Sequence, residues 1–415
     1  MTSRLRRFSG LLFACALGSL PALAAGAAEA PATSLADAVL DPALIASLRY
    51  RYEFVDDDGL LRDANASTLR LRLGVRTRAW RGLSFTIEGE GVAHLGPERF
   101  NDTVNGRTAF PVVADPENVV LNRVFGRWQP RDWIAVDAGR QAINFDDQRF
   151  IGSVGWRQND QTMDSAGLVL TPTRAVRLEA RYVWRVNRIF GPDSPVGVWK
   201  DNDIVLLNGS AVLAPGVEFG AYAYLLDIPG AAASSSQTYG VRLKGAHALT
   251  GDLSGLYRLE YARQSDHARN PREFALDYWR LEAGLKAHGA HLKFGFERLE
   301  GKDGVAFQTP LATLHAFNGW ADKFLTTPPA GLEDRSIDLG WKPQGPAWAK
   351  RLNLGFVFHH FSADRGGATY GREYDALVSG KLPWGVVLTA KFARYAAKNL
   401  GTDSSKFWLM AAFAF

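Results

Sequence analysis

Apolar and polar side chains alternate along most of this chain. In one early segment, Leu48, Tyr50 and Tyr52 are interleaved with Arg49 and Arg51. Successive side chains of a β-strand point to opposite faces of the sheet, so each such segment has one apolar and one charged face. The same pattern recurs as far as the C-terminal residue. The chain is therefore predicted to be all-β.

The alternation divides the chain into separate strands. We predict about 18 of them, each roughly as long as a tilted transmembrane strand needs to be. The predicted strands span residues 46–55, 67–79, 83–94, 119–129, 133–142, 165–171, 174–186, 204–214, 217–227, 237–247, 253–264, 276–287, 290–300, 335–342, 350–361, 371–382, 386–396 and 405–415.

The connections between these strands differ in length in a regular way. Those after even-numbered strands are short and carry turn residues, as at Pro215-Gly216. Short turns at one rim and long loops at the other are typical of an antiparallel transmembrane β-barrel, with periplasmic turns and extracellular loops. The long connections follow odd-numbered strands, at about residues 95–118, 143–164, 187–203 and 301–334.

A soluble sandwich or propeller is the alternative all-β fold. Aromatic residues collect near the strand ends on the apolar face, as in the aromatic girdles of membrane barrels, and the alternation continues to Phe415. The polar face carries clusters of arginine. A helical membrane protein is excluded, because the most apolar stretch, residues 211–233, is interrupted by Pro215 and Glu218.

The N-terminus has the features of a secretory signal. Basic residues, an apolar run and a small-residue cleavage site predict a signal peptide over residues 1–24. Residues 25–45 then form an N-terminal periplasmic segment, and residues 46–415 form the barrel, located in the outer membrane of a Gram-negative cell. The single cysteine, Cys15, excludes a disulfide scaffold. The net charge of +5 is too small to indicate nucleic-acid binding.

Two loop stretches resemble a known family. Gly139-Arg140-Gln141 opens a stretch that continues over residues 147–159, and the second stretch covers residues 307–324. Both are similar to the alginate export family of outer-membrane porins. The resemblance implies a monomeric barrel of 18 strands, with an arginine-rich lumen that passes an anionic polysaccharide outward by diffusion.

The charged face predicts the chemistry of the lumen. A barrel of this size leaves a water-filled interior, and an excess of basic side chains there attracts anions. The run from Arg70 to Arg78 has few acidic partners in its own strand and is the best candidate for anion contact. Pairing of arginines with acids on neighbouring strands is the alternative. The candidate pore-lining residues are Arg49, Arg51, Arg70, Arg72, Arg76, Arg78, Arg140, Arg157, Arg177, Arg181 and Arg185.

The loop over residues 143–164 is predicted to fold into the pore. Its apolar residues, including Phe150 and Trp156, require burial that an exposed loop does not give. Arg140 and Arg157 are then expected to border the narrowest point. In the alternating pattern of its own strand, however, Arg140 falls on the face that is otherwise apolar.

The most direct functional hypothesis is a passive channel for anionic solutes or an anionic polysaccharide. A general porin, an outer-membrane lipid hydrolase and an adhesin or scaffold are the alternatives. The sequence has no nucleophile elbow and no phosphate loop, and its histidine pairs lack metal-site spacing, so no enzyme activity, cofactor or metal is predicted.

The expected partners are outer-membrane lipid and lipopolysaccharide. The acidic run Asp56-Asp57-Asp58 either takes up calcium or is simply solvated.

Overall fold

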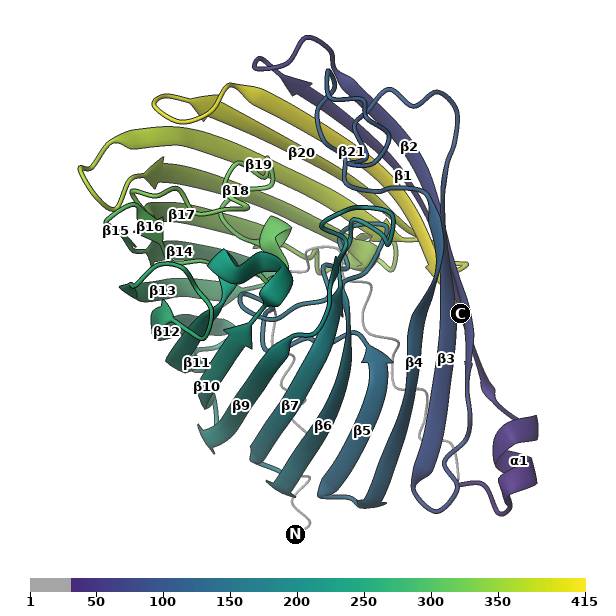
Figure 1. Ribbon diagram of the computed structural model, residues 1–415. Coiled ribbons are helices and arrows are strands. Elements are labelled where there is room, and N and C mark those ends of the chain that lie inside the picture. The colour runs from purple at the N-terminus through teal and green to yellow at the C-terminus, as the bar shows by residue number, and fades with distance from the viewer. Residues whose placement is uncertain (1–30) are drawn as a thin grey trace.

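The strands form one closed antiparallel barrel. The computed structural model describes residues 31–415, and the predicted signal peptide lies outside the described residues. Each of the 18 wall strands pairs with the next, and β21 pairs back with β1 to close the sheet (Figure 1). The wall strands are β1 (Ala43–Asp57), β2 (Ala64–Arg76), β3 (Leu83–His94), β4 (Asn118–Arg131), β5 (Ile134–Gln141), β6 (Thr162–Thr173), β7 (Val176–Asn187), β9 (Asp203–Ala214), β10 (Val217–Asp227), β11 (Ser236–Thr250), β12 (Leu253–Asp266), β13 (Ala275–Ala287), β14 (Ala290–Leu299), β17 (Leu332–Trp341), β18 (Leu352–Ser362), β19 (Thr369–Lys381), β20 (Val387–Ala397) and β21 (Ser404–Ala414).

A few short elements lie outside the wall. The helix α1 (Leu35–Leu40) begins at Ser34, whose hydroxyl accepts a hydrogen bond from the Asp37 backbone N–H at 3.0 Å. The two-residue strand β8 (Val198–Trp199) pairs with β7, and β15 (Gly301–Lys302) pairs with β16 (Val305–Ala306). The 3₁₀ turns are η1 (Pro229–Ser234), η2 (Leu314–Ala316) and η3 (Ala349–Arg351).

None of the helices in residues 31–415 combines the length and the apolar character that crossing a membrane requires.

All the predicted strands are present, and the differences lie at their ends. β1 begins at Ala43, inside the predicted N-terminal segment. β2 ends at Arg76 instead of continuing to residue 79, because the Thr77 hydroxyl accepts a hydrogen bond from the Phe85 backbone N–H at 3.0 Å and a turn follows. Arg78 therefore lies beyond the wall, where it forms an ion pair of 3.0 Å with Asp41 near α1.

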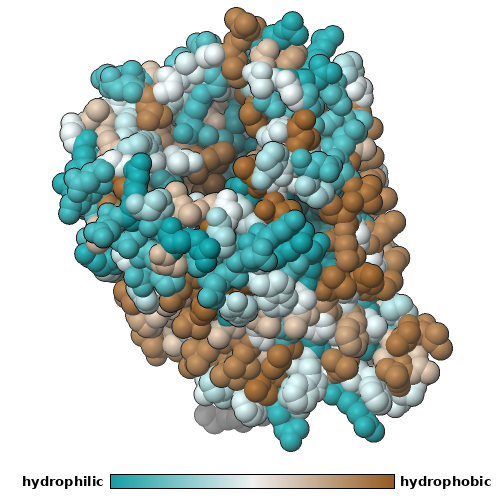
Figure 2. Space-filling view, viewed as in Figure 1, coloured by the Kyte–Doolittle hydropathy of each residue, from teal (hydrophilic) through white to brown (hydrophobic). Residues whose placement is uncertain are grey.

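The two faces of the wall have opposite character. On β2, Leu71 and Leu73 are 44% and 53% exposed, whereas Arg70 and Arg72 between them are buried. The outer face is therefore apolar and the inner face is charged. Figure 2 shows apolar side chains over the lower wall, and hydrophilic side chains around a hollow at the opposite end. An apolar surface of this extent is stable only in contact with an apolar environment such as lipid.

Connection length separates the two rims, as predicted. At the short-turn rim, Gly216 connects β9 to β10 with φ +77°, and a side chain there would lie 2.1 Å from the Ala246 carbonyl oxygen. The long connections, residues 95–117, 142–161, 188–202 and 300–331, all leave the opposite rim, which we call the long-loop rim.

The face assignment gives a first prediction. Leu71→Arg puts a charge on the apolar face near the middle of β2, and it should lower the free energy of unfolding from lipid by roughly 2–4 kcal/mol. Folding into vesicles across a urea series measures this. Leu83→Arg, on the same face at the end of β3, is the matched control and should cost only about 0–1 kcal/mol. Equal costs at the two positions would contradict the assignment of a lipid-facing wall.

Candidate functional site in the barrel interior

Two loops fold into the barrel and meet there. The first inward loop is residues 142–161, between β5 and β6, and the second inward loop is residues 307–331, between β16 and β17. Ile151 forms a parallel bridge with Leu311, and the Gly152 N–H donates to the Leu311 carbonyl at 2.8 Å. The predicted infolding of the first loop is confirmed. The second inward loop coincides with the second stretch that the family resemblance singled out.

Burial of apolar side chains explains why the first inward loop turns inward. Phe150, Ile151 and Trp156 are all buried in the main hydrophobic cluster of the barrel. The Phe150 ring lies 5.3 Å from that of Tyr278 on β13, in an edge-on arrangement. Exposing these rings to solvent at the rim would forfeit roughly 1.5–3 kcal/mol for each fully buried side chain.

Two of the predicted pore-lining arginines hold the first inward loop in place. Arg49 donates to the Gly155 carbonyl at 2.8 Å, to the Gln158 side-chain oxygen at 2.9 Å, and to the Arg157 carbonyl. Arg51 donates to the Trp156 carbonyl. These arginines on β1 therefore satisfy the polar backbone of the loop, which has no secondary structure of its own to do so.

Arg157 connects three segments instead of bordering open water. Its guanidinium lies 3.3 Å from Glu53 on β1 and 3.4 Å from Asp322 of the second inward loop. Asp115, from the loop that follows β3, pairs with Arg51 at 3.0 Å and accepts from the Gln158 N–H at 2.7 Å. Three loops and one strand thus share a single buried ionic network.

Arg149 makes the corresponding connection on the other side of the interior. It pairs with Glu297 on β14 at 2.7 Å, and it donates to Thr309 at 3.0 Å and to Asn318 at 3.1 Å. Arg149 is itself buried. One residue of the first inward loop therefore attaches both loops to the wall.

A lysine surrounded by aromatic rings anchors the second inward loop. The Lys391 ammonium, on β20, lies 4.0 Å from the Trp156 ring centroid and 3.8 Å from that of Trp320. It also donates to His315 Nε2 at 2.8 Å. The His315 ring stacks on Trp156 with centroids 4.3 Å apart.

The surroundings of His315 and Asp322 determine the protonation states of these two side chains. Burial, together with the positive charge of Lys391, holds the pKa of His315 well below its ordinary value, so the imidazole is neutral. Its Nδ1–H donates to Asp322 at 2.8 Å. Burial opposes the ionisation of Asp322, but Lys406 at 2.8 Å and the His315 hydrogen bond hold its pKa well below the usual range.

Carboxylates of the first inward loop neutralise one side of the wall. Asp146 pairs with Arg242 on β11. Asp147 pairs with Arg258 on β12 at 2.8 Å and with Arg280 on β13 at 2.7 Å. On this side of the interior the wall arginines are therefore paired with acidic side chains, which is the alternative interpretation of the charged face. The acidic partners come from a loop as well as from neighbouring strands.

The wall near β2 is neutralised only in part. Arg72 pairs with Glu90 at 2.5 Å and with Asp160 at 2.6 Å. Arg70, in contrast, has no hydrogen bond or ion pair within the described part of the chain. It lies directly opposite Arg49 in the β1–β2 register, and Arg49 bonds only to uncharged groups there. Like charges opposite each other on adjacent strands repel.

The remaining candidates fall into three groups. Arg177 is half exposed on the inner face of β7 and pairs with Glu179 at 2.5 Å, and Arg181 pairs with Asp137 at 2.5 Å. Arg76 is exposed near the short-turn rim. The third group is Arg140 and Arg185, which share Asp164.

The register resolves the orientation of Arg140. Gln141 lies opposite the buried Met163, so the next pair, Arg140 and Asp164, points to the outer face. Arg140 donates to Asp164 at 2.6 Å, and Arg185 approaches the same carboxylate at 3.9 Å. The expectation that Arg140 borders the narrowest point is therefore not met, because strand alternation turns it away from the lumen.

Among the candidate arginines, the fold thus brings together in the interior Arg49, Arg51, Arg70, Arg72 and Arg157. The candidates that lie elsewhere are Arg76, Arg78, Arg140 and Arg185. The candidate list did not include Asp115, Arg149, His315, Asp322 and Lys391. Most of their partners lie far away in the chain.

Comparison with known proteins identifies the fold. No family model matches the chain, and no curated protein matches it. Among solved structures, it is similar to Acinetobacter baumannii OccAB2, with a TM-score of 0.70 and 15% identity over 90% of this chain and 98% of that one. For Pseudomonas aeruginosa OccK9 (OpdG) the values are 0.73 and 13%, over 91% and 99%. For P. aeruginosa OpdK with vanillate they are 0.69 and 13%, over 91% and 99%.

These structures share the barrel architecture of the Occ/Opd porins. Identities this low show the fold alone. The resemblance to the alginate export family receives no support from these comparisons.

The anchoring of the loops gives a second prediction. Arg149→Ala leaves the buried Glu297 without its ion-pair partner, with only hydrogen bonds from Tyr278 and Asn318, and should lower the free energy of unfolding by about 3–5 kcal/mol. The inward loops should also become sensitive to added protease. Arg177→Ala is the matched control, because that side chain is 53% exposed, and an exposed pair of this kind contributes only about 0–1 kcal/mol. Similar stability and protease resistance in both variants would show that Arg149 does not anchor the loops.

Proposed function

We propose that this chain is an outer-membrane channel that passes small anionic solutes. The observation that carries the proposal is the pair Arg49 and Arg70, which lie opposite each other on the inner wall without an ion pair among the described residues. Two guanidinium groups held together with no carboxylate in direct contact, and with only Asp115, Glu90 and Asp160 acting from farther away, favour occupation of the neighbouring space by an anion.

Several features support placement in a membrane. The outer wall is apolar over most of its height, and the barrel fold is the one found in the Occ/Opd porins. Closure of the sheet within one chain means that a monomer is sufficient to form a channel. The short-turn rim would face the periplasm and the long-loop rim the cell exterior.

The outer face of the long-loop rim supports this orientation. Arg335, His360 and Arg372 lie side by side on β17, β18 and β19, on the face that carries the exposed Ile337 and Tyr374. Basic groups just beyond the apolar band are suited to the phosphates of lipopolysaccharide, which we propose as the lipid partner at this rim.

The inward loops favour a small solute over a polymer. A wide, open lumen would suit export of an alginate-like polysaccharide, but here two loops occupy the interior and are tied to β1, β14 and β20. Vanillate, which accompanies OpdK in its crystal structure, is a small carboxylate and illustrates the class of solute that such a narrowed barrel can admit. We therefore propose small organic anions as the substrates.

A passive role is also proposed, in place of catalysis. The buried charged groups of the interior are engaged in holding loops, as Arg157 and Asp322 are, and this leaves them poorly placed for chemistry. A lipid hydrolase would show lipid turnover without conductance, and an adhesin or scaffold would show neither. Bilayer recordings beside a lipid-hydrolysis assay distinguish these alternatives.

Reversal potentials give the third prediction. In planar bilayers under a chloride gradient, the unmodified pore should prefer anions, and the preference should weaken as the Debye length falls from about 10 Å at 0.1 M to about 3 Å at 1 M salt. The variant Arg70→Gln should shift the permeability ratio toward unity, because it removes a charge that has no ion pair among the described residues and leaves the contacts of Arg49 with the first inward loop in place.

Arg78→Gln is the matched control, since it also removes an arginine but one that lies beyond the end of β2. It should leave the reversal potential unchanged. Cation preference in the unmodified pore, or equal behaviour of the Arg70→Gln variant and the control, would contradict the proposed function.

A further inference from the structure

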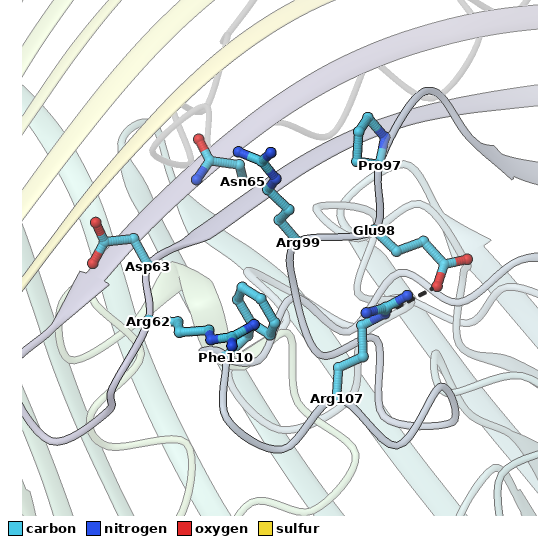
Figure 3. Close-up of a pocket in the computed structure, with 8 residues that line it drawn as sticks. All are labelled: Arg62, Asp63, Asn65, Pro97, Glu98, Arg99, Arg107 and Phe110. Atoms are coloured by element: carbon cyan, nitrogen blue, oxygen red, sulfur yellow. Dashed lines mark hydrogen bonds and ion pairs between the residues drawn. The ribbon is translucent and has the colours of Figure 1, made fainter.

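Three potential metal ligands converge where β3 leaves the barrel. His94 ends β3, and Glu98 and Glu117 lie near the two ends of the loop that follows. One ligand atom from each lies within 4.8 Å of the others. Of the three, Glu98 lines a surface pocket of about 690 Å³, in which it faces Arg107 (Figure 3). Solvent therefore reaches Glu98 from this pocket.

The orientation of the His94 side chain is a second, independent observation that indicates a bound metal ion. Its side chain is only 4% exposed. Nε2 lies 2.9 Å from the Asp115 carbonyl oxygen, which can only accept, so Nε2 carries the proton and donates. In the neutral imidazole Nδ1 then carries a lone pair; it has no hydrogen-bond partner and faces a Glu98 oxygen at 3.5 Å. The edge-on contact with Phe100 fixes the ring in this position.

A lone pair that faces a carboxylate is repulsive unless a proton or a metal cation lies between them. We propose that His94, Glu98 and Glu117 bind one divalent metal ion of the zinc class. One imidazole and two carboxylates are suitable ligands for Zn²⁺, and a water molecule would complete a tetrahedral set. The hydrogen bond from Nε2 to a backbone carbonyl is the outer-shell support that metal-bound histidines commonly have. The imidazole nitrogen favours zinc and its neighbours over calcium, which prefers oxygen ligands.

Other contacts position the two carboxylates. The His94 backbone N–H donates to Glu117 at 2.6 Å, and Arg107 donates to Glu98 at 3.2 Å. Each contact engages only one oxygen of its carboxylate. The second oxygen of each remains available to a metal, so binding requires little rearrangement of the loop.

The site is connected to the inward loops through Asp115. The backbone carbonyl of Asp115 accepts from His94, while its carboxylate binds Arg51 at 3.0 Å and the Gln158 N–H at 2.7 Å. A bound ion would tie both ends of the loop over residues 95–117 to β3, and would stiffen the segment that holds the first inward loop. This inference concerns metal binding and does not depend on the chain being a channel.

Calorimetry with ZnCl₂ tests the site on the full-length protein, without a histidine tag and in detergent. The unmodified protein should bind one ion per chain, and His94→Gln should weaken binding by at least about tenfold, as should Glu117→Gln. His247→Gln is the matched control, because His247 is exposed and stacks only on Tyr257, and it should bind as the unmodified protein does. A gel shift on heating, retained by every variant, shows that the barrel is folded.

Two further readouts identify the ligands. With Cu²⁺ as the probe, electron paramagnetic resonance should show coupling to one nitrogen, which His94→Gln removes. Excess Ca²⁺ should not displace Zn²⁺. Saturable binding that survives in folded His94→Gln, or no saturable binding at all, would overturn the site. Displacement by an equal concentration of Ca²⁺ would overturn the assignment to the zinc class.

Discussion

The interior depends on one kind of contact, in which arginines of the wall donate to backbone carbonyls and carboxylates of the inward loops. A loop without secondary structure carries many polar backbone groups, and each costs free energy if it is buried without a partner. Arg49 and Arg51 supply donors to the first inward loop, and Arg149 returns a donor from that loop to the wall. Removing these contacts would leave polar groups of the loops buried without partners, and only the burial of apolar side chains would then hold the loops inside the barrel.

Strand alternation made most of the fold predictable from sequence. The period of two fixes which side chains share a face, and connection length fixes which strand ends share a rim. Both depend only on local order, so all the wall strands were located. Strand ends were less predictable, because β2 stops where the Thr77 hydroxyl binds the Phe85 N–H across the turn, a contact that hydrophobic periodicity does not register.

The interior was predictable only in part, and the reason is distance along the chain. The infolding of the first inward loop followed from its own apolar residues. Its partners did not, because Asp115, Asp322 and Lys391 come from three other segments of the chain. The proposed metal-binding group was also not predicted: His94 and Glu98 are close in sequence, but Glu117 joins them only through the course of the intervening loop.

The pairing of β1 with β21 also constrains the order in which the molecule can assemble. The first and last strands of the wall meet, with Ser47 opposite Ala414, so the seam forms only after the whole chain is available. Contacts between residues so far apart in sequence make folding slow, because the entropy of ordering the intervening chain is lost first. The aromatic surroundings of Lys391 include Trp156, from the other half of the chain, and Trp408 of β21 itself. The loops should therefore settle last, and an assembly intermediate should be a nearly complete cylinder with an unfilled centre.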